Sequence, residues 1–214
     1  MERDVRPKSA RRLPDWFVAV AEDVLSYCRP EEGVWVDLGC GSGGLGLALA
    51  RASRSTILLV DPRANALRKA LESAKHSGLG TRALAVAGRA ESMPFADCSV
   101  NLVVSRGSVF FWDEPAQGLR EVYRILGPGG RALVGGGFGS SYPESARQEF
   151  FRRRNQELKA RSEKALDDWY SKRRPEWLEL QARAAGLGES LLEPVPPGFW
   201  LLFEKGGVES AQRH

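Results

Sequence analysis

The stretch Val34-Trp35-Val36-Asp37-Leu38-Gly39-Cys40-Gly41-Ser42-Gly43 decides how this chain of 214 residues is interpreted. The apolar, β-branched run at its start predicts a buried strand, and residues 45–51, just after its end, read as a helix. Only glycine lets the backbone turn sharply between the two while a ligand approaches it closely. The amide nitrogens at the start of the helix favour a polar or anionic ligand.

Strands and helices alternate from this stretch onward. The pattern predicts further strands over residues 56–60, 82–87, 100–105 and 131–134, and helices over residues 65–77 and 115–126. Because the strands are apolar on both faces, a parallel sheet covered by helices on both sides is expected. The predicted fold class is α/β, a doubly wound, Rossmann-like sheet.

Three segments lie outside this alternation. Residues 14–28 predict an amphipathic helix, residues 143–186 predict two helices broken at Pro175, and residues 191–204 predict a terminal β-hairpin. We expect residues 1–30 to form an N-terminal helical lid. Residues 31–214 are expected to form one ligand-binding domain with a helical insertion at about 143–186, which would complete the lid over the sheet edge.

The composition is that of a globular protein, with 43% hydrophobic and 27% charged residues, and it excludes a disordered chain. The three cysteines are widely spaced and form no Cys-x-x-Cys or Cys/His cluster, so we predict no metal site and no disulfide framework. The charged start of the chain precedes no apolar segment, and no run approaches the ~18 residues of a spanning helix. A cytoplasmic protein without a membrane segment is therefore expected.

The net charge of +4 is unevenly distributed, because Lys and Arg outnumber Asp and Glu between residues 147 and 174. Such a basic segment fits a solvated helix, an anionic substrate or a nucleic acid.

An acidic residue stands where a ribose-binding carboxylate is expected. Asp61 ends the second predicted strand, about 20 residues beyond the glycines, as in dinucleotide-binding units. This spacing makes a purely structural role for the glycine turn a weaker alternative.

Four motifs together resemble class I S-adenosylmethionine-dependent methyltransferases of the methyltransferase type 11 kind. Residues 37–43, Asp-Leu-Gly-Cys-Gly-Ser-Gly, are similar to motif I of that family, and Asp61 is similar to its motif II carboxylate. Residues 88–95, Gly-Arg-Ala-Glu-Ser-Met-Pro-Phe, resemble the segment that lines the adenine. Residues 126–130, Leu-Gly-Pro-Gly-Gly, resemble the turn before the fifth strand. The resemblance implies a seven-stranded sheet whose last strand, residues 199–204, is antiparallel.

The resemblance also implies S-adenosyl-L-methionine as cofactor, with S-adenosyl-L-homocysteine as product. The residues that would bind it are Asp37, Gly39, Cys40, Gly41, Gly43, Asp61, Pro62, Arg89, Ala90, Glu91 and Ser105.

The chain departs from the family pattern at three places. Arg89 replaces the aspartate that usually accepts from the adenine amino group, so adenine recognition must use Ala90 backbone groups or Glu91. Asn101 replaces the usual aspartate of the fourth strand. Residues 105–108, Ser-Arg-Gly-Ser, replace the Asn/Asp-Pro-Pro-Tyr/Phe motif of enzymes that methylate nucleobase amino groups or glutamine, which argues against those activities.

The predicted reaction is in-line methyl transfer to a small molecule, for which positioning supplies most of the acceleration. His76 and His214 are interpreted as surface residues, so an acceptor that is already ionised or lacks a proton is favoured: a thiolate, carboxylate, phenolate or soft inorganic centre. Arg106, Asp113 and Tyr142 are the candidates for positioning the acceptor. Residues 110–112, Phe-Phe-Trp, form either a loop anchor or an aromatic wall.

Three alternatives stay open at this stage. The basic residues 147–174 are compatible with an RNA methyltransferase, although no aromatic residue is interleaved with Arg152, Arg153 and Arg154. A nicotinamide oxidoreductase is compatible with the glycine turn but lacks a Tyr-x-x-x-Lys set. A catalytically silent domain that binds the cofactor or a partner is compatible with Arg89.

Overall fold

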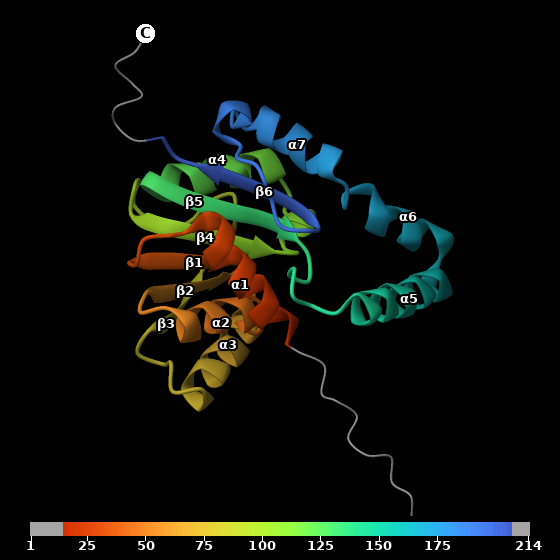
Figure 1. Ribbon diagram of the computed structural model, residues 1–214, viewed down its shortest axis with the longest axis horizontal. Coiled ribbons are helices and arrows are strands. Elements are labelled where there is room, and N and C mark those ends of the chain that lie inside the picture. Colours follow the sequence, from red (N-terminus) through yellow and green to blue (C-terminus); the bar gives the residue numbers. More distant parts are fainter. Residues whose placement is uncertain (1–14, 207–214) are drawn as a thin grey trace, which may run out of the picture.

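A computed structural model describes residues 15–206 of the chain (Figure 1). The elements follow in the order α1 (Trp16–Cys28), β1 (Val34–Leu38), α2 (Gly44–Ala52), β2 (Thr56–Asp61), α3 (Ala64–His76), β3 (Ala83–Ala87), β4 (Val100–Arg106), α4 (Pro115–Ile125), β5 (Leu126–Gly136), α5 (Glu144–Arg161), α6 (Glu163–Ser171), α7 (Pro175–Ala184) and β6 (Phe199–Glu204). Two short 3-10 turns span Val109–Phe111 and Gly188–Ser190.

One mostly parallel sheet organises the described residues, with strand order β3-β2-β1-β4-β5-β6. All neighbours are parallel except β6, which runs antiparallel to β5. The order reverses between β1 and β4, and ligands bind at the carboxyl ends of the strands at such a switch point. The predicted α/β, doubly wound fold is confirmed.

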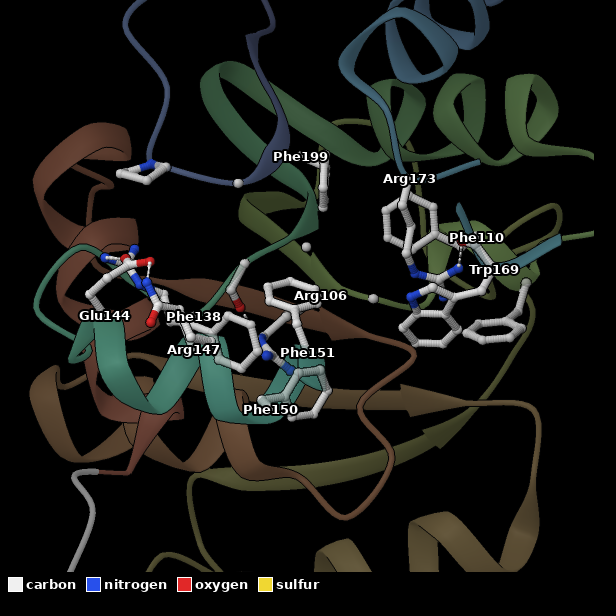
Figure 2. A pocket seen from close by; sticks show the side chains of 17 residues that line it. Arg106, Phe110, Phe138, Glu144, Arg147, Phe150, Phe151, Trp169, Arg173 and Phe199 are labelled. Atoms are coloured by element: carbon white, nitrogen blue, oxygen red, sulfur yellow. Dashed lines mark hydrogen bonds and ion pairs between the residues drawn. The ribbon is translucent and has the colours of Figure 1, made fainter. Parts of the chain in front are cut away.

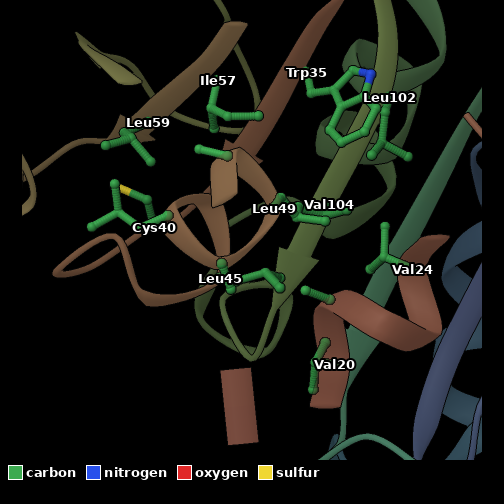
Figure 3. Close-up of a cluster of buried hydrophobic side chains, with 14 of the residues drawn as sticks. Val20, Val24, Trp35, Cys40, Leu45, Leu49, Ile57, Leu59, Leu102 and Val104 are labelled. Atoms are coloured by element: carbon green, nitrogen blue, oxygen red, sulfur yellow. The ribbon is translucent and has the colours of Figure 1, made fainter. Parts of the chain in front are cut away.

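Two hydrophobic clusters fill the space on the two faces of the sheet. The first joins α1, α2 and α3 to one face through side chains such as Val24, Trp35 and Leu49 (Figure 3). The second joins α4 and α7 to the other face through Leu119, Leu178 and their neighbours. Both faces of the sheet are therefore covered, as the apolar strands predicted.

The strand count differs from the expected one. The sheet has six strands within residues 15–206, not seven. Residues 191–195 were expected to pair with 199–204 as a hairpin, but they contribute only an isolated bridge from Leu191 to Phe203 and a hydrogen bond from the Leu192 amide to the Leu202 carbonyl. Two prolines, Pro194 and Pro196, lie in or beside this stretch and lack the amide hydrogen that a strand ladder needs.

The helical insertion contains three helices where two were expected. The break at Pro175 is present, since Pro175 is the first residue of α7. A further break falls at Ser162, whose extended backbone ends α5 and whose side chain accepts a hydrogen bond from the Ala165 amide to cap α6. Figure 1 shows α5 and α6 projecting from the body of the molecule and returning to it through α7.

The first helix packs against the body of the domain. Val20, Val24 and Cys28 on α1 are completely buried in the cluster shared with α2 and the sheet. Residues 1–14 of the expected N-terminal segment lie outside the described residues. The part of the chain that the structure describes contains no helix both long and apolar enough to cross a bilayer.

Candidate functional site

A cavity of about 530 Å³ opens at the carboxyl ends of β1, β2, β3 and β4. Its walls come from the turns and loops that follow these strands. Of the residues expected to bind the cofactor, those lining it are Gly39, Asp61, Pro62, Arg89, Ala90 and Glu91. Its other wall residues are Leu38, Arg63, Gly88, Arg106, Gly107, Ser108, Phe111, Trp112 and Asp113.

The glycine turn after β1 is held against β2. The amides of Gly39 and Cys40 both donate to the Val60 carbonyl, at 2.8 and 2.9 Å, and the Gly41 amide donates to Asp61 Oδ2 at 3.1 Å. Gly41 has a φ of +56°, and a Cβ placed there would meet no atom within 4 Å. A side chain at Gly41 would therefore project into open space, which fits a position where a ligand approaches the backbone.

Asp37 faces the protein interior and not the cavity. Its carboxylate is 2% exposed and accepts a hydrogen bond from the Gly46 amide at 2.8 Å, in the first turn of α2. Burial raises the pKa of Asp37 to about 7, opposed by the Gly46 hydrogen bond and reinforced by the nearby charge of Asp61. Asp37 thus positions the glycine turn through α2, and its part in binding the cofactor stays a prediction.

Asp61 is the buried anion of the cavity wall. Its carboxylate accepts from the Gly41 amide, from the Arg63 amide at 3.0 Å and from Arg63 Nε and Nη2 at 3.0 and 3.1 Å. Burial raises the pKa of Asp61, but the hydrogen bonds from Arg63 and Gly41 outweigh it and hold the pKa below its ordinary value. The side chain of Arg63 is 69% exposed, whereas that of Asp61 is 2% exposed.

Arg89 is neutralised by carboxylates on the other side of the cavity. Its Nη2 donates to Asp113 Oδ2, and its Nε lies 3.6 Å from Glu91 Oε2. Glu91 also accepts from the Asp113 and Glu114 amides, at 2.9 and 3.2 Å, just before α4 begins. The departure at position 89 is therefore accompanied by a compensating carboxylate, Asp113. Asp113 lines the 530 Å³ cavity, which we call the cofactor cavity because it contains residues expected to bind the cofactor, whereas we expected Asp113 to position the acceptor.

A serine network joins the loop after β4 to the glycine turn. Ser108 Oγ donates to the Leu38 carbonyl at 3.0 Å and accepts from Trp112 Nε1 at 3.1 Å. Ser105 Oγ lies 2.6 Å from Ser108 Oγ. Ser105 is fully buried and does not line the cavity. The nearby Gly39 must be glycine, because its Cβ would lie 2.2 Å from the Ser108 Cβ.

A second cavity, of about 390 Å³, lies between the sheet edge and the helices α5 and α6 (Figure 2). We call it the aromatic cavity, because its walls contain Phe110, Phe111, Phe138, Phe150, Phe151, Trp169 and Phe199. Arg106, Gly107 and Phe111 line both cavities. The two cavities therefore adjoin at the loop after β4.

Arg106 is enclosed by aromatic rings at this junction. Its guanidinium carbon lies 5.3 Å from the ring centres of Trp16 and Phe17 and 5.6 Å from that of Phe138, and its Nε donates to the Gly137 carbonyl at 2.7 Å. Burial lowers the pKa of Arg106, while the negative charge of Asp37 opposes this shift. Arg106 makes no ion pair with Glu91 or Asp113, since both of these carboxylates pair with Arg89.

Sequence reasoning missed or misplaced several other side chains. Tyr142 lines neither cavity; its ring stacks on Phe138, 5.5 Å between centres, in a cluster with Trp16. Cys40, Gly41, Gly43 and Ser105 are not among the residues that line the cofactor cavity, and their part in binding the cofactor stays a prediction. The residues 110–112 combine both expected roles, since Trp112 is in the core and Phe111 is 71% exposed at the cavity junction. Phe138, Phe150 and Arg173 were not singled out; the apolar side of residues 143–174 was the signal that could have found Phe150.

The basic residues of α5 form ion pairs along the helix itself. Arg152 and Arg153 both pair with Glu149, at 2.8 and 2.5 Å, and Arg154 pairs with Glu157 at 3.2 Å. Pairs of this spacing stabilise an exposed helix and partly neutralise its charge.

The chain has a doubly wound sheet with a glycine turn and the carboxylate of Asp61 at its switch point. This combination is typical of proteins that bind a nucleotide cofactor. Residues 36–134 match the family described as methyltransferase domain. In three dimensions the chain is similar to a crystallised candidate S-adenosylmethionine-dependent methyltransferase from Methanococcus maripaludis. The two are 29% identical with a TM-score of 0.75, covering 89% of this chain and 85% of that one.

Curated proteins of related sequence are also named as methyltransferases. The chain is 34% identical over 142 residues to 2-methyl-6-phytyl-1,4-hydroquinone methyltransferase of Arabidopsis thaliana, which covers 64% of this chain and 39% of the relative. It is 30% identical over 112 residues to a ubiquinone/menaquinone biosynthesis C-methyltransferase of Legionella pneumophila, covering 51% and 44%. The matches thus span less than half the length of these two relatives. These findings identify residues 36–134 as a methyltransferase domain and support the assignment of the chain to the class I S-adenosylmethionine-dependent methyltransferases.

Proposed function

We propose that this chain transfers a methyl group from S-adenosylmethionine to a small, flat and largely apolar acceptor bound in the aromatic cavity. The observation that carries this proposal is that the cofactor cavity and the aromatic cavity share Arg106, Gly107 and Phe111. A donor in one cavity and an acceptor in the other would meet there, and holding them in line is the main requirement of a direct displacement.

The cofactor cavity suits S-adenosylmethionine. Asp61 offers a carboxylate to the ribose hydroxyls once Arg63 releases it, and the open side of Gly41 leaves room for the methionine end beside residues 39–43. Ala90 and Glu91 line the side where the adenine would lie. When bound, the cofactor supplies a methyl group on a positively charged sulfur.

The walls of the aromatic cavity favour an acceptor that needs no base. Glu144 is the one carboxylate among its lining residues, and it is engaged by Arg147 at 2.6 Å. No His, Cys, Lys or Tyr is among those residues. A phenolate, thiolate or activated carbon could therefore react if the guanidinium of Arg106 stabilises the ionised form through the donors left free by Gly137. The hydroquinone named for the Arabidopsis relative is an acceptor of this flat, ionisable kind.

The helices α5 and α6 complete the acceptor site in this proposal. Phe150, Phe151 and Trp169 come from these helices and close one side of the aromatic cavity (Figure 2). A cover of this kind excludes water from the reacting groups.

The test combines binding and turnover. Calorimetric titration should show that S-adenosylhomocysteine binds the wild-type chain and binds Asp61→Ala ~10- to 100-fold more weakly. The chain is then incubated with S-adenosylmethionine and separate panels of hydroquinones, phenols, thiols and carboxylates, and S-adenosylhomocysteine formation is measured. Cofactor binding without turnover on any panel would favour the catalytically silent alternative.

A further inference from the structure

The aromatic cavity carries more positive charge than its own walls neutralise. Three arginines line it, Arg106, Arg147 and Arg173, against the single carboxylate of Glu144. Arg147 is paired with Glu144. Within residues 15–206, neither Arg106 nor Arg173 has a carboxylate at ion-pair distance. Two guanidinium groups therefore face the cavity without an ion-pair partner among the described residues, although the charges of Asp37 and Asp15 act on Arg106 from beyond ion-pair distance.

Arg173 lies between α6 and α7 and is held by stacking. Its guanidinium carbon lies 3.4 Å from the ring centre of Trp169 and 4.5 Å from that of Phe110 (Figure 2). Its Nη1 donates to the Trp169 carbonyl at 2.7 Å, and its Nε and Nη2 have no partner in the described part of the chain. Burial lowers its pKa to about 10, and repulsion from Arg154 adds to the shift. An anion beside Arg173 would offset both effects.

Two further donors of the cavity walls lack a partner. Trp169 Nε1 and Arg147 Nε are buried and make no hydrogen bond within the described residues. Buried donors are almost always satisfied in folded proteins, so the orphan Nε1 of Trp169, whose ring stacks against Arg173, indicates a missing acceptor atom at this end of the cavity. Oxygen atoms of a ligand would supply it.

We propose that Arg173 forms an anion-binding subsite, and that the methyl acceptor is a flat aromatic molecule with an oxyanionic substituent remote from the methylated atom. This inference rests on the proposed function. The aromatic walls favour a ring, while a stacked guanidinium with two free donors favours a carboxylate, sulfonate or phosphate. Arg106 lies at the junction with the cofactor cavity, whereas Arg173 belongs only to the aromatic cavity, so the two cations serve different ends of the acceptor.

The alternative is that Arg173 only joins α6 to the loop at Phe110 by stacking. A matched pair of probes separates the two roles, because 2-naphthoate and 2-naphthamide have the same ring and differ mainly in charge. We expect the wild-type chain to bind the carboxylate at least ~10-fold more tightly than the amide. Arg173→Gln should remove this preference while leaving amide binding unchanged, and Arg173→Lys should retain part of it.

Arg174→Gln is the matched control, since Arg174 is the next residue, is exposed and lines neither cavity. It should keep the full preference for the carboxylate. Each variant is also titrated with S-adenosylhomocysteine. Loss of cofactor binding would count against the proposed function, and this titration detects it separately from a change in probe binding. Equal binding of the two probes to the wild type, binding of neither, or an unchanged preference in Arg173→Gln would overturn the assignment of the subsite.

Discussion

Replacing Asp37 by asparagine should make the chain's stability markedly less dependent on pH. Asp37 is buried beneath the glycine turn, where its pKa is raised to about 7 from an ordinary value of 3.8. Below pH 3.8 the carboxyl is protonated in both the folded and the unfolded chain. Between these values the folded chain keeps the proton and the unfolded chain loses it. Stability therefore falls as the pH rises through this window, and the fall ends near pH 7.

The magnitude follows from the size of the shift. A difference of about 3 pKa units corresponds to about 4 kcal/mol of unfolding free energy across the window, or about 1.4 kcal/mol for each pH unit. An asparagine at position 37 stays neutral, and its amide oxygen can still accept from the Gly46 amide. Its buried NH₂ group costs about 1–3 kcal/mol, but this cost does not change with pH.

Urea unfolding of the wild type and Asp37→Asn without cofactor, between about pH 4.5 and 6.5, measures the effect. The stability of the variant relative to the wild type should rise by about 1.4 kcal/mol per pH unit. Asp168→Asn, which removes an exposed carboxylate from α6, controls for the loss of one charge. If the difference between Asp37→Asn and the wild type is the same at every pH, Asp37 is ionised throughout the window and the reasoning is wrong.

Three further predictions concern the site. Asp61→Ala should weaken S-adenosylhomocysteine binding by about 1.5–3 kcal/mol, because a charge-assisted acceptor for the ribose is lost; unchanged affinity in the folded variant would remove Asp61 from the cofactor site. Gly107→Ala should cost about 1–2 kcal/mol of stability, because φ is +80°, and should raise the acceptor KM, because the new methyl group enters the junction of the cavities. Gly78→Ala has a similar φ of +69° and open surroundings away from both cavities, so it should show the stability loss alone. Arg106→Lys should raise the acceptor KM and spare cofactor affinity; a lower melting temperature with unchanged acceptor kinetics would instead show that Arg106 is structural.

The local sequence pattern was sufficient to predict those site residues that lie in the turns following the strands. Gly39, Asp61, Pro62, Arg89, Ala90 and Glu91 line one cavity because parallel strands bring their carboxyl ends to the same edge of the sheet. The same reasoning did not reveal the hydrogen bond between Asp37 and the start of α2, since the residue alternation of a strand does not tell which helix end a buried carboxylate meets.

By itself, the sequence determined the alternation of strands and helices, the glycine turn at residues 39–43 and the carboxylate that ends β2. These depend on residue periodicity and on backbone conformations open to few residue types, so they can be read from neighbouring positions. Only the tertiary structure decided that Asp113 compensates Arg89, that α1 belongs to the core and that the aromatic cavity exists. Each of these depends on packing between segments that are distant in the chain, such as Phe110 after β4 and Arg173 after α6, and no local pattern specifies that packing.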